Sequence, residues 1–170
     1  MARITALLHT ENDAMRLGRA LETVYACDDI LVVDHGSRDA TVRIAREYGA
    51  RVVDATEGRS TRDYLQIFSQ VVNQSGAPGW FLCLAPSESL TEKLAASLFE
   101  WKFDSSAGRA PAAVAFAMFL REETADGWVE VPAPQTRLVP HTWTDWKGPL
   151  PVHDPSATAL DGELLRFVFP

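Results

Sequence analysis

Two uninterrupted apolar runs place the strongest constraint on what this chain can fold into. They are DILVVD at residues 29–34 and WFLCLA at residues 80–85. Both lack the alternating polar residues of a strand that has one face in water. Continuous apolar strands belong to sheets that are covered on both faces. A buried sheet of the α/β class is therefore expected.

Strand-like and helix-like segments alternate through the first half of the chain. Strands are predicted at residues 3–9, 29–34, 50–55 and 80–85. Helices are predicted at residues 11–26, 39–49, 60–76 and 88–103. Met15, Leu17, Leu21, Val24 and Tyr25 would form the apolar stripe of the first helix, and Glu88 would lie near the start of the fourth. The short connections predict a parallel, right-handed sheet flanked by helices.

The second half of the chain has a different pattern. Strand-like runs at residues 109–123, 127–132, 135–140 and 162–170 are separated by proline-rich connectors. They predict antiparallel strands added to the parallel sheet. Residues 140–162 are polar, aromatic and proline-rich without a clear period, and either an ordered loop over a cleft or a mobile segment is expected there.

Composition excludes several classes of function. The net charge of -7 argues against nucleic acid as the main partner. No apolar run approaches the ~20 residues of a membrane span, and no signal peptide is recognisable, so a cytoplasmic protein is expected. Cys27 and Cys83 lie among apolar residues and are expected in the core. Glycine-rich dinucleotide and phosphate-binding motifs are missing, which disfavours hydride transfer and ATP hydrolysis.

Polar residues follow the first two predicted strands. HTEND ends the first strand and VVDHGSRD ends the second, at the edge of a doubly wound sheet where nucleotides bind. Thr10 and Glu11 could flank a base, and Asp34 could accept hydrogen bonds from a base or ribose. Gly36 permits the bend. Helix capping and turn formation would also account for such residues without a ligand.

Further motifs extend this pattern. They are AREYGARVV at residues 45–53, EGRSTRDYLQ at 57–66, QTRLV at 135–139, WKGPLPVHD at 146–154 and LDGELLRFVF at 160–169. Together with HTEND and VVDHGSRDAT, their order resembles family 2 glycosyltransferases, closest to the compact bacterial lipopolysaccharide-core and cell-envelope type. The resemblance covers essentially the whole chain. It implies a GT-A fold, a UDP-type nucleotide-sugar donor and inverting transfer.

The resemblance also implies a single domain of residues 1–170 whose two halves bind different substrates. Residues 1–104 would form the nucleotide-binding half, and residues 105–170 the acceptor-side half. Arg62 would contact the nucleotide, unless it forms a salt bridge on the helix surface. Ser87, Glu88 and His153 would lie near the diphosphate and any metal.

The chain departs from the family at the tip of its fourth strand. The family has Asp-Ala-Asp-Glu there, and these carboxylates hold Mg²⁺ or Mn²⁺ against the diphosphate. This chain has Ala85-Pro86-Ser87-Glu88, so only Glu88 remains. A degenerate Asp-x-Asp motif predicts weak metal binding, and no metal ligand is assigned.

The residue that would serve as catalytic base is also missing. Ala133 stands where the family has an acidic residue before the QTRLV strand. Losing a general base costs about 10²–10⁴-fold in rate. Asp154 and Asp145 are weak candidates to replace it. The chain is thus expected to bind a nucleotide-sugar with weakened or lost catalysis, or to be a non-catalytic binding or scaffold protein with a protein partner.

Overall fold

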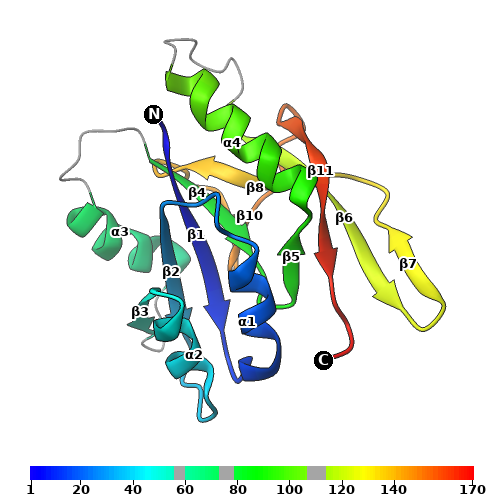
Figure 1. Ribbon diagram of the computed structural model, residues 1–170. Coiled ribbons are helices and arrows are strands. Elements are labelled where there is room, and N and C mark those ends of the chain that lie inside the picture. Colours follow the sequence, from blue (N-terminus) through cyan, green and yellow to red (C-terminus); the bar gives the residue numbers. More distant parts are fainter. Residues whose placement is uncertain (56–59, 73–78, 107–113) are drawn as a thin grey trace.

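The computed structural model describes residues 1–55, 60–72, 79–106 and 114–170. Within these residues, nine strands form one sheet in the order β3-β2-β1-β4-β8-β6-β11-β5, with β7 beside β6 (Figure 1). They are β1 (Arg3–Thr10), β2 (Asp29–Asp34), β3 (Arg51–Asp54), β4 (Gly79–Leu84), β5 (Glu88–Leu90), β6 (Phe116–Thr124), β7 (Gly127–Glu130), β8 (Gln135–Pro140) and β11 (Thr158–Arg166).

Four helices and a small hairpin accompany this sheet in the described ranges. They are α1 (Ala14–Glu22), α2 (Thr41–Glu47), α3 (Thr61–Val72), α4 (Glu92–Ser106), and the hairpin of β9 (Trp146–Lys147) and β10 (Leu150–Pro151). None of the helices in these ranges is long and apolar enough to cross a bilayer.

The strand pairing confirms the predicted α/β class. Strands β3, β2, β1 and β4 pair in parallel, as the strand–helix alternation of the first half predicts. Strand β8 then pairs antiparallel with β4 and with β6, and β5 pairs antiparallel with β11. Strands β6 and β11 are parallel to each other. The second half therefore extends the parallel sheet with antiparallel strands.

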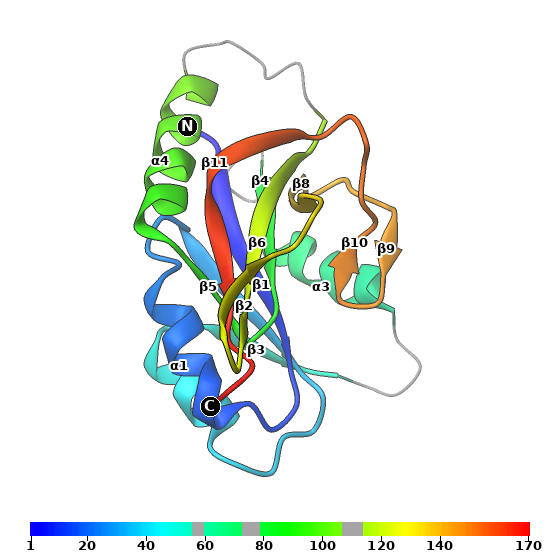
Figure 2. The same ribbon diagram turned by 90° about the vertical axis from the view of Figure 1, so that its right-hand side faces the viewer.

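Both faces of the central strands are buried, which explains their uninterrupted apolar sequences. In β1, Leu8 packs into one apolar cluster and Leu7 into a second. In β2, Val32 and Val33 divide between the two clusters in the same way. Figure 2 shows α1 and α4 on one side of the sheet, and α3 with the β9–β10 hairpin on the other. Each face thus receives apolar side chains from alternate residues.

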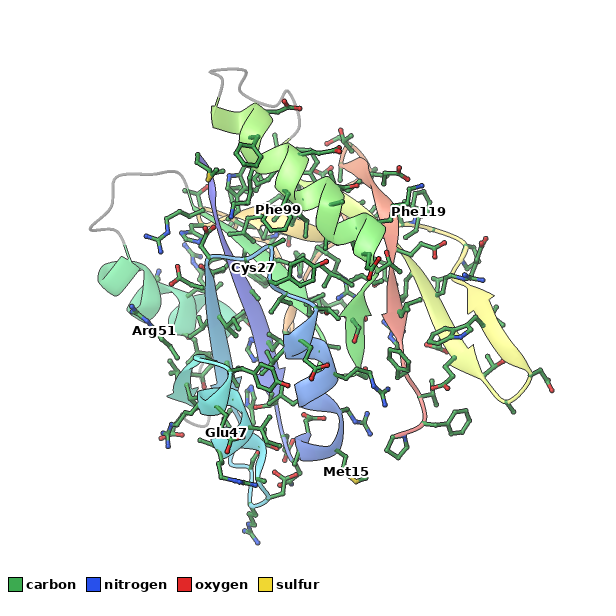
Figure 3. All side chains as sticks on the ribbon, viewed as in Figure 1. Met15, Cys27, Glu47, Arg51, Phe99 and Phe119 are labelled. Carbon is green, nitrogen blue, oxygen red and sulfur yellow. The ribbon has the colours of Figure 1, made fainter. Side chains whose placement is uncertain are left out.

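The predicted apolar stripe of the first helix is only partly correct. Leu17, Leu21 and Val24 are buried against the sheet, whereas Met15 is 79% exposed and Tyr25 is 59% exposed. Figure 3 shows Met15 pointing away from the protein at the start of α1. The predicted helix was too long, because α1 begins at Ala14 and ends at Glu22. Tyr25 lies beyond it, against Phe99 of α4.

The prediction that Glu88 begins the fourth helix is wrong. Glu88 lies in β5, which pairs with β11, and α4 begins only at Glu92. The Thr91 hydroxyl accepts a hydrogen bond from Leu94 N–H in the first turn of α4. Residues 88–90 therefore form a strand and not the first turn of the helix, because backbone pairing with β11 outweighs local helix propensity.

The long loop predicted at residues 140–162 contains regular structure. The β9–β10 hairpin lies within it, and β11 begins at Thr158 instead of Gly162. The pairing of β11 with β6 shifts register between Ala159 and Glu163, so an irregularity interrupts the strand there. A strand with such an irregularity does not show the regular two-residue alternation by which strands are predicted from sequence.

Cys83 is buried in the core, as predicted, and the half-buried Cys27 packs against it. Cys27 and Cys83 are free thiols, and burial raises the pKa of each to about 12. Since the thiolate is the reactive form, neither is suited to nucleophilic chemistry.

Gly162 provides a test of the contact between β11 and α4. It has a φ of 102°, and an added Cβ would overlap the backbone of Leu94. Gly127 has a similar φ of 123°, but its Cβ would meet open space. We expect Gly162→Ala to lower the free energy of unfolding by clearly more than Gly127→Ala, which should cost only the backbone strain of about 1–3 kcal/mol. Equal losses in urea unfolding would contradict the close contact.

Candidate functional site

The loops after β1 and β2 are joined by hydrogen bonds centred on Asp34. Its carboxylate is buried and accepts hydrogen bonds from the hydroxyl of Thr10 at 2.7 Å and of Ser37 at 2.6 Å. Ser37 N–H also donates to it, at 2.9 Å. Burial alone would raise the pKa of Asp34, but these hydrogen bonds outweigh it and lower the pKa. Asp34 therefore fixes the geometry of both loops.

Gly36 allows the backbone to form the same turn. Its φ is 78°, a backbone conformation that favours glycine. The polar network extends further, since Asn12 N–H donates to the Ser37 hydroxyl and Arg38 N–H donates to the Asn12 side chain. The two loops that the sequence assigned to a nucleotide are thus held together without any ligand.

A cavity of about 540 Å³ lies beside these loops. This volume is in the range of small-molecule sites. The cavity is bounded by the carboxyl ends of β1 and β2, the start of α3, and the β9–β10 hairpin. Its lining residues are His9, Thr10, Glu11, Asp13, His35, Ser60, Thr61, Tyr64, Trp146, Gly148 and Pro149. The Thr61 hydroxyl donates a hydrogen bond to Gly148 C=O at 2.6 Å, which joins α3 to the hairpin across one side.

The cavity brings together some of the predicted nucleotide-binding residues and not others. Thr10 and Glu11 line it, whereas Asp34 and Gly36 are not among its lining residues. Arg62 is exposed on α3 and lines a separate cavity of about 160 Å³. Trp146 lines both cavities. Residues 57–59, which begin the EGRSTRDYLQ motif, lie outside the described residues.

Three aromatic side chains in the cavity wall were not singled out from the sequence. His9 Nδ1 and His35 Nε2 are 2.9 Å apart and share a hydrogen bond. Tyr64 packs edge-on against both rings, with centroids 6.5 Å from His9 and 6.4 Å from His35. Burial and the neighbouring His35 lower the pKa of His9 to about 4. The sequence signal that could have identified the two histidines is their position, because each is next to a residue that was predicted to bind a nucleotide.

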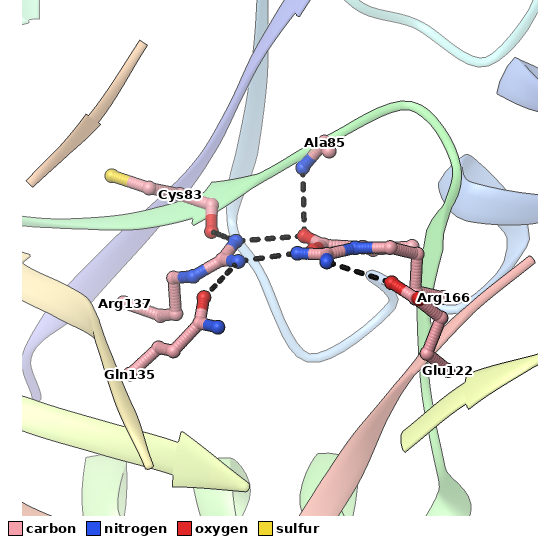
Figure 4. A network of polar contacts seen from close by, with 7 residues as sticks. Cys83, Ala85, Glu122, Gln135, Arg137 and Arg166 are labelled. Carbon is pink, nitrogen blue, oxygen red and sulfur yellow. Dashed lines mark hydrogen bonds and ion pairs between the residues drawn. The ribbon is translucent and has the colours of Figure 1, made fainter. Parts of the chain in front are cut away.

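The tip of β4 carries a buried ion-pair network in place of free carboxylates. Glu88 is fully buried, and its two oxygens bind Arg137 bidentately at 2.7 and 2.9 Å. Arg166 Nη2 also binds Glu88 at 2.9 Å, and Ala85 N–H donates to it at 2.9 Å (Figure 4). Burial would raise the pKa of Glu88, but the Arg137 charge and the hydrogen bonds outweigh it and lower the pKa.

This network leaves little at the strand tip for a metal. Both oxygens of Glu88 already accept hydrogen bonds from guanidinium groups, and Ser87 contributes its backbone carbonyl to Phe167 N–H. Among the described residues, no group of three or more His, Cys, Asp or Glu side chains is placed to hold a metal ion.

His153, which was predicted near the diphosphate, and the candidate bases Asp145 and Asp154 do not line the 540 Å³ cavity. His153 is exposed, and its Nδ1 shares a hydrogen bond of 3.0 Å with the Thr136 hydroxyl. Asp154 accepts hydrogen bonds from the N–H and hydroxyl of Ser156, which lower the pKa of its carboxyl group. Asp145 is exposed and uses its backbone carbonyl to accept from the Trp143 indole.

Curated relatives agree with the family resemblance. An uncharacterised glycosyltransferase of Rickettsia felis is 43% identical over 54 residues, which is 31% of this chain and 19% of that protein. The 4,4'-diaponeurosporenoate glycosyltransferase of Staphylococcus aureus is 33% identical over 64 residues, which is 36% of this chain and 17% of that protein. The chain resembles glycosyltransferases.

A longer match is to a protein that is not named as a glycosyltransferase. A TPR repeat-containing protein of Synechococcus elongatus is 34% identical over 142 residues, which is 81% of this chain. The match covers 31% of that protein. The chain thus spans less than a third of the length of each of these curated relatives. No family model matches the chain.

The solved structures that resemble the chain are distant matches. Staphylococcus aureus TarS has a TM-score of 0.46 and 14% identity, with 76% of this chain and 23% of that chain covered. Glucosyl-3-phosphoglycerate synthase from Mycobacterium tuberculosis, in complex with Mn²⁺, UDP and glucosyl-3-phosphoglycerate, has a TM-score of 0.41 and 16% identity. That match covers 71% of this chain and 43% of that chain.

The Glu88 network generates a prediction about stability. Glu88→Gln removes the charge that compensates Arg137, whose side chain is 1% exposed. Breaking a buried ion pair from one side costs about 3–5 kcal/mol, and we expect a loss of that size in denaturant unfolding. The matched control is Glu122→Gln, which affects the more exposed pair with Arg166 and should cost less than about 1 kcal/mol. Similar losses in both variants would contradict the assigned role of Glu88.

His9 generates a prediction about pH. The pKa of His9 is about 4 in the folded protein, against 6.5 for an ordinary imidazole. Between these values the unfolded chain binds a proton that the folded chain does not, so stability falls as the pH falls from 6.5 towards 4. The loss is roughly 3 kcal/mol at most. We expect His9→Phe to reduce this loss in unfolding curves measured across that range, and an unchanged pH dependence would contradict the assignment.

Proposed function

We propose that the chain is a glycosyltransferase-like domain that binds a nucleotide-sugar, most simply a UDP-type donor, in the 540 Å³ cavity. The observation that carries this proposal is the position of the cavity at the carboxyl ends of β1 and β2, where Thr10 and Glu11 line it. In open α/β sheets, ligands bind outside the carboxyl ends of the strands. The sequence resemblance to glycosyltransferases supports the same choice.

We further propose that sugar transfer by this chain is weakened or lost. Ala85-Pro86-Ser87 offers no carboxylate to a divalent metal, and Glu88 is held by Arg137 and Arg166. Among the described residues, the candidate base Asp154 is also poorly suited to deprotonate an acceptor hydroxyl. The pKa of Asp154 is lowered by its hydrogen bonds from Ser156, and a carboxylate with a low pKa is a weak general base.

The second candidate is a non-catalytic binding or scaffold protein that keeps the glycosyltransferase fold and acts with a protein partner. The observation that favours it is the use of Glu88. The carboxylate that remains at the strand tip contributes to the buried packing of four strands instead of facing the cavity. In this case the fold provides a surface for a protein partner, and ligand binding in the cavity is weak or lacking.

Isothermal titration calorimetry tests the proposal. UDP, GDP, CMP, dTDP and their sugar conjugates would be titrated into the protein with Mn²⁺ and with a chelator. We expect binding of one nucleotide type, with an affinity that Mn²⁺ changes by less than about threefold. Failure of all of them to bind at millimolar concentration would reject nucleotide binding and leave the scaffold candidate.

Restoring the carboxylates tests whether the strand tip accounts for the loss of metal binding. We expect the double variant Ala85→Asp, Ser87→Asp to gain about tenfold in Mn²⁺-dependent nucleotide affinity, because two hard oxygen ligands return beside the diphosphate. The matched control is Ala85→Asn, Ser87→Asn, which has similar volume without the charges. No gain in the aspartate variant would show that more than the tip is altered.

A further inference from the structure

A second cavity, of about 160 Å³, lies between α3 and the segment that leads from β8 into the β9–β10 hairpin. Helix α3 and the hairpin cover the same side of the sheet (Figure 2). The cavity is lined by Arg62, Leu65 and Gln66 of α3, by residues 141–144 and by Trp146. Among the described residues, only Trp146 also lines the 540 Å³ cavity. Because the volume is below the ~300–1,000 Å³ of drug-sized sites, the second cavity suits a ligand with a single ring.

Trp143 and Trp146 form the aromatic wall of the second cavity. Both are half-buried and pack against the apolar cluster that contains Leu65. The Trp143 indole N–H donates to Asp145 C=O at 2.7 Å, and the Trp146 indole N–H donates to Trp143 C=O at 3.2 Å. These bonds fix both rings within the hairpin segment and satisfy their polar atoms. What the two rings can offer a ligand is therefore apolar π surface.

Arg62 is the one charged side chain among the described residues that line the second cavity, apart from the histidine. It is exposed, and no hydrogen bond or ion pair joins it to another described residue. The carboxylate of the neighbouring Asp63 accepts hydrogen bonds from the N–H and hydroxyl of Ser60 at the start of α3. The Arg62 guanidinium is thus available for an anion, which it can bind with two parallel N–H donors.

His141 lies between the second cavity and β4. Its ring packs on Phe81 with the centroids 4.1 Å apart, and its backbone N–H donates to Gly79 C=O at 2.9 Å. An added Cβ at Gly79 would overlap the His141 ring, so the ring can lie here only because residue 79 has no side chain. Burial lowers the pKa of His141. The ring is therefore neutral at physiological pH, and Arg62 alone determines the charge of the cavity.

The two neighbouring cavities differ in the sign of their charge. Glu11 and Asp13 line the 540 Å³ cavity, and no Lys or Arg is among its described lining residues. The described lining of the second cavity contains Arg62 and neither Asp nor Glu. Since the whole chain has a net charge of -7, positive sites for an anion are scarce on its surface. A small anion is therefore attracted to the second cavity and repelled from the first.

We propose that the second cavity binds a small anion whose ring has an apolar face, with the ring against Trp143 and Trp146 and the anionic group on Arg62. An aromatic carboxylate and an acidic sugar both have this chemistry. Apolar π surface supplies contact area for the ring, and a single cation fixes its orientation. The inference goes beyond the proposed function, because it concerns a site outside the cavity that is proposed for the nucleotide-sugar.

A titration of the wild-type protein followed by nuclear magnetic resonance tests the chemistry. The probes are benzoate and glucuronate, the uncharged benzyl alcohol and glucose, and the ringless anions acetate and pyrophosphate. We expect benzoate or glucuronate to bind at least about tenfold more tightly than its uncharged counterpart and than either ringless anion. Binding of benzoate alone would identify an aromatic acid, and binding of glucuronate alone an acidic sugar.

Three outcomes of this titration would overturn the inference. The first is failure of both benzoate and glucuronate to bind at up to about 50 mM. The second is equal affinity for the charged and uncharged rings, which would exclude a role for Arg62. The third is equal affinity for pyrophosphate, which would indicate a site for phosphate groups without a ring. None of these outcomes affects nucleotide binding, which the calorimetric series with nucleotides tests separately.

The indole resonances locate the bound ring without any substitution. Saturation with the tighter probe should shift the indole N–H signals of Trp143 and Trp146. The signal of Trp128 should stay unchanged, because this ring lies on β7 against Phe167 and lines neither cavity among the described residues. Unchanged signals of Trp143 and Trp146 in the saturated protein would show that the probe binds elsewhere and would overturn the inference.

Arg62→Gln tests the cation, because glutamine keeps a polar side chain on the exposed face of α3 and removes the charge. We expect the affinity for the tighter probe to fall about tenfold or more, as for the loss of a charge-assisted bidentate contact. The matched control is Arg43→Gln on α2, where Arg43 is also exposed and faces Glu47. It should change the affinity by less than about twofold. Equal effects of the two substitutions would overturn the inference.

Discussion

The buried carboxylate of Glu88 is the interaction on which the centre of this structure depends. It lies in β5 and joins Arg137 of β8, Arg166 of β11 and the backbone at the end of β4. A charge buried to this extent is tolerated only when its partners satisfy it. The parallel first half and the mixed second half of the sheet are therefore held together at this point. The same pairing withdraws the one remaining carboxylate of the strand tip from metal chemistry.

The tip of β4 and the cavity differ in the charged and polar side chains that they present. Positive charge gathers at the tip, but Glu88 and Glu122 neutralise it within the network. The cavity is lined by aromatic rings, hydroxyl groups and the carboxylates of Glu11 and Asp13. This contrast is consistent with the proposed weakness in sugar transfer.

The sequence predicted where the two polar loops lie in the sheet, but not how their side chains bond to each other. HTEND and VVDHGSRD do end neighbouring parallel strands, because side chains after such strands must meet at one edge of the sheet. Asp34, however, is satisfied by Thr10 and Ser37 within the loops. The hairpin residue Trp146 and the helix residue Tyr64 come from distant segments. Their approach to His9 depends on how α3 and the hairpin pack on the sheet.

The sequence by itself determined the α/β class, the parallel first half and the lack of carboxylates at residues 85–87, because burial on both faces and side-chain chemistry are properties of local sequence. Tertiary structure alone decided the role of Glu88. A helix start and a short strand are both compatible with residues 88–90, and pairing with β11 selects the strand. It also decided that His9 and His35 meet, since a hydrogen bond between residues 26 positions apart requires the parallel register of β1 and β2.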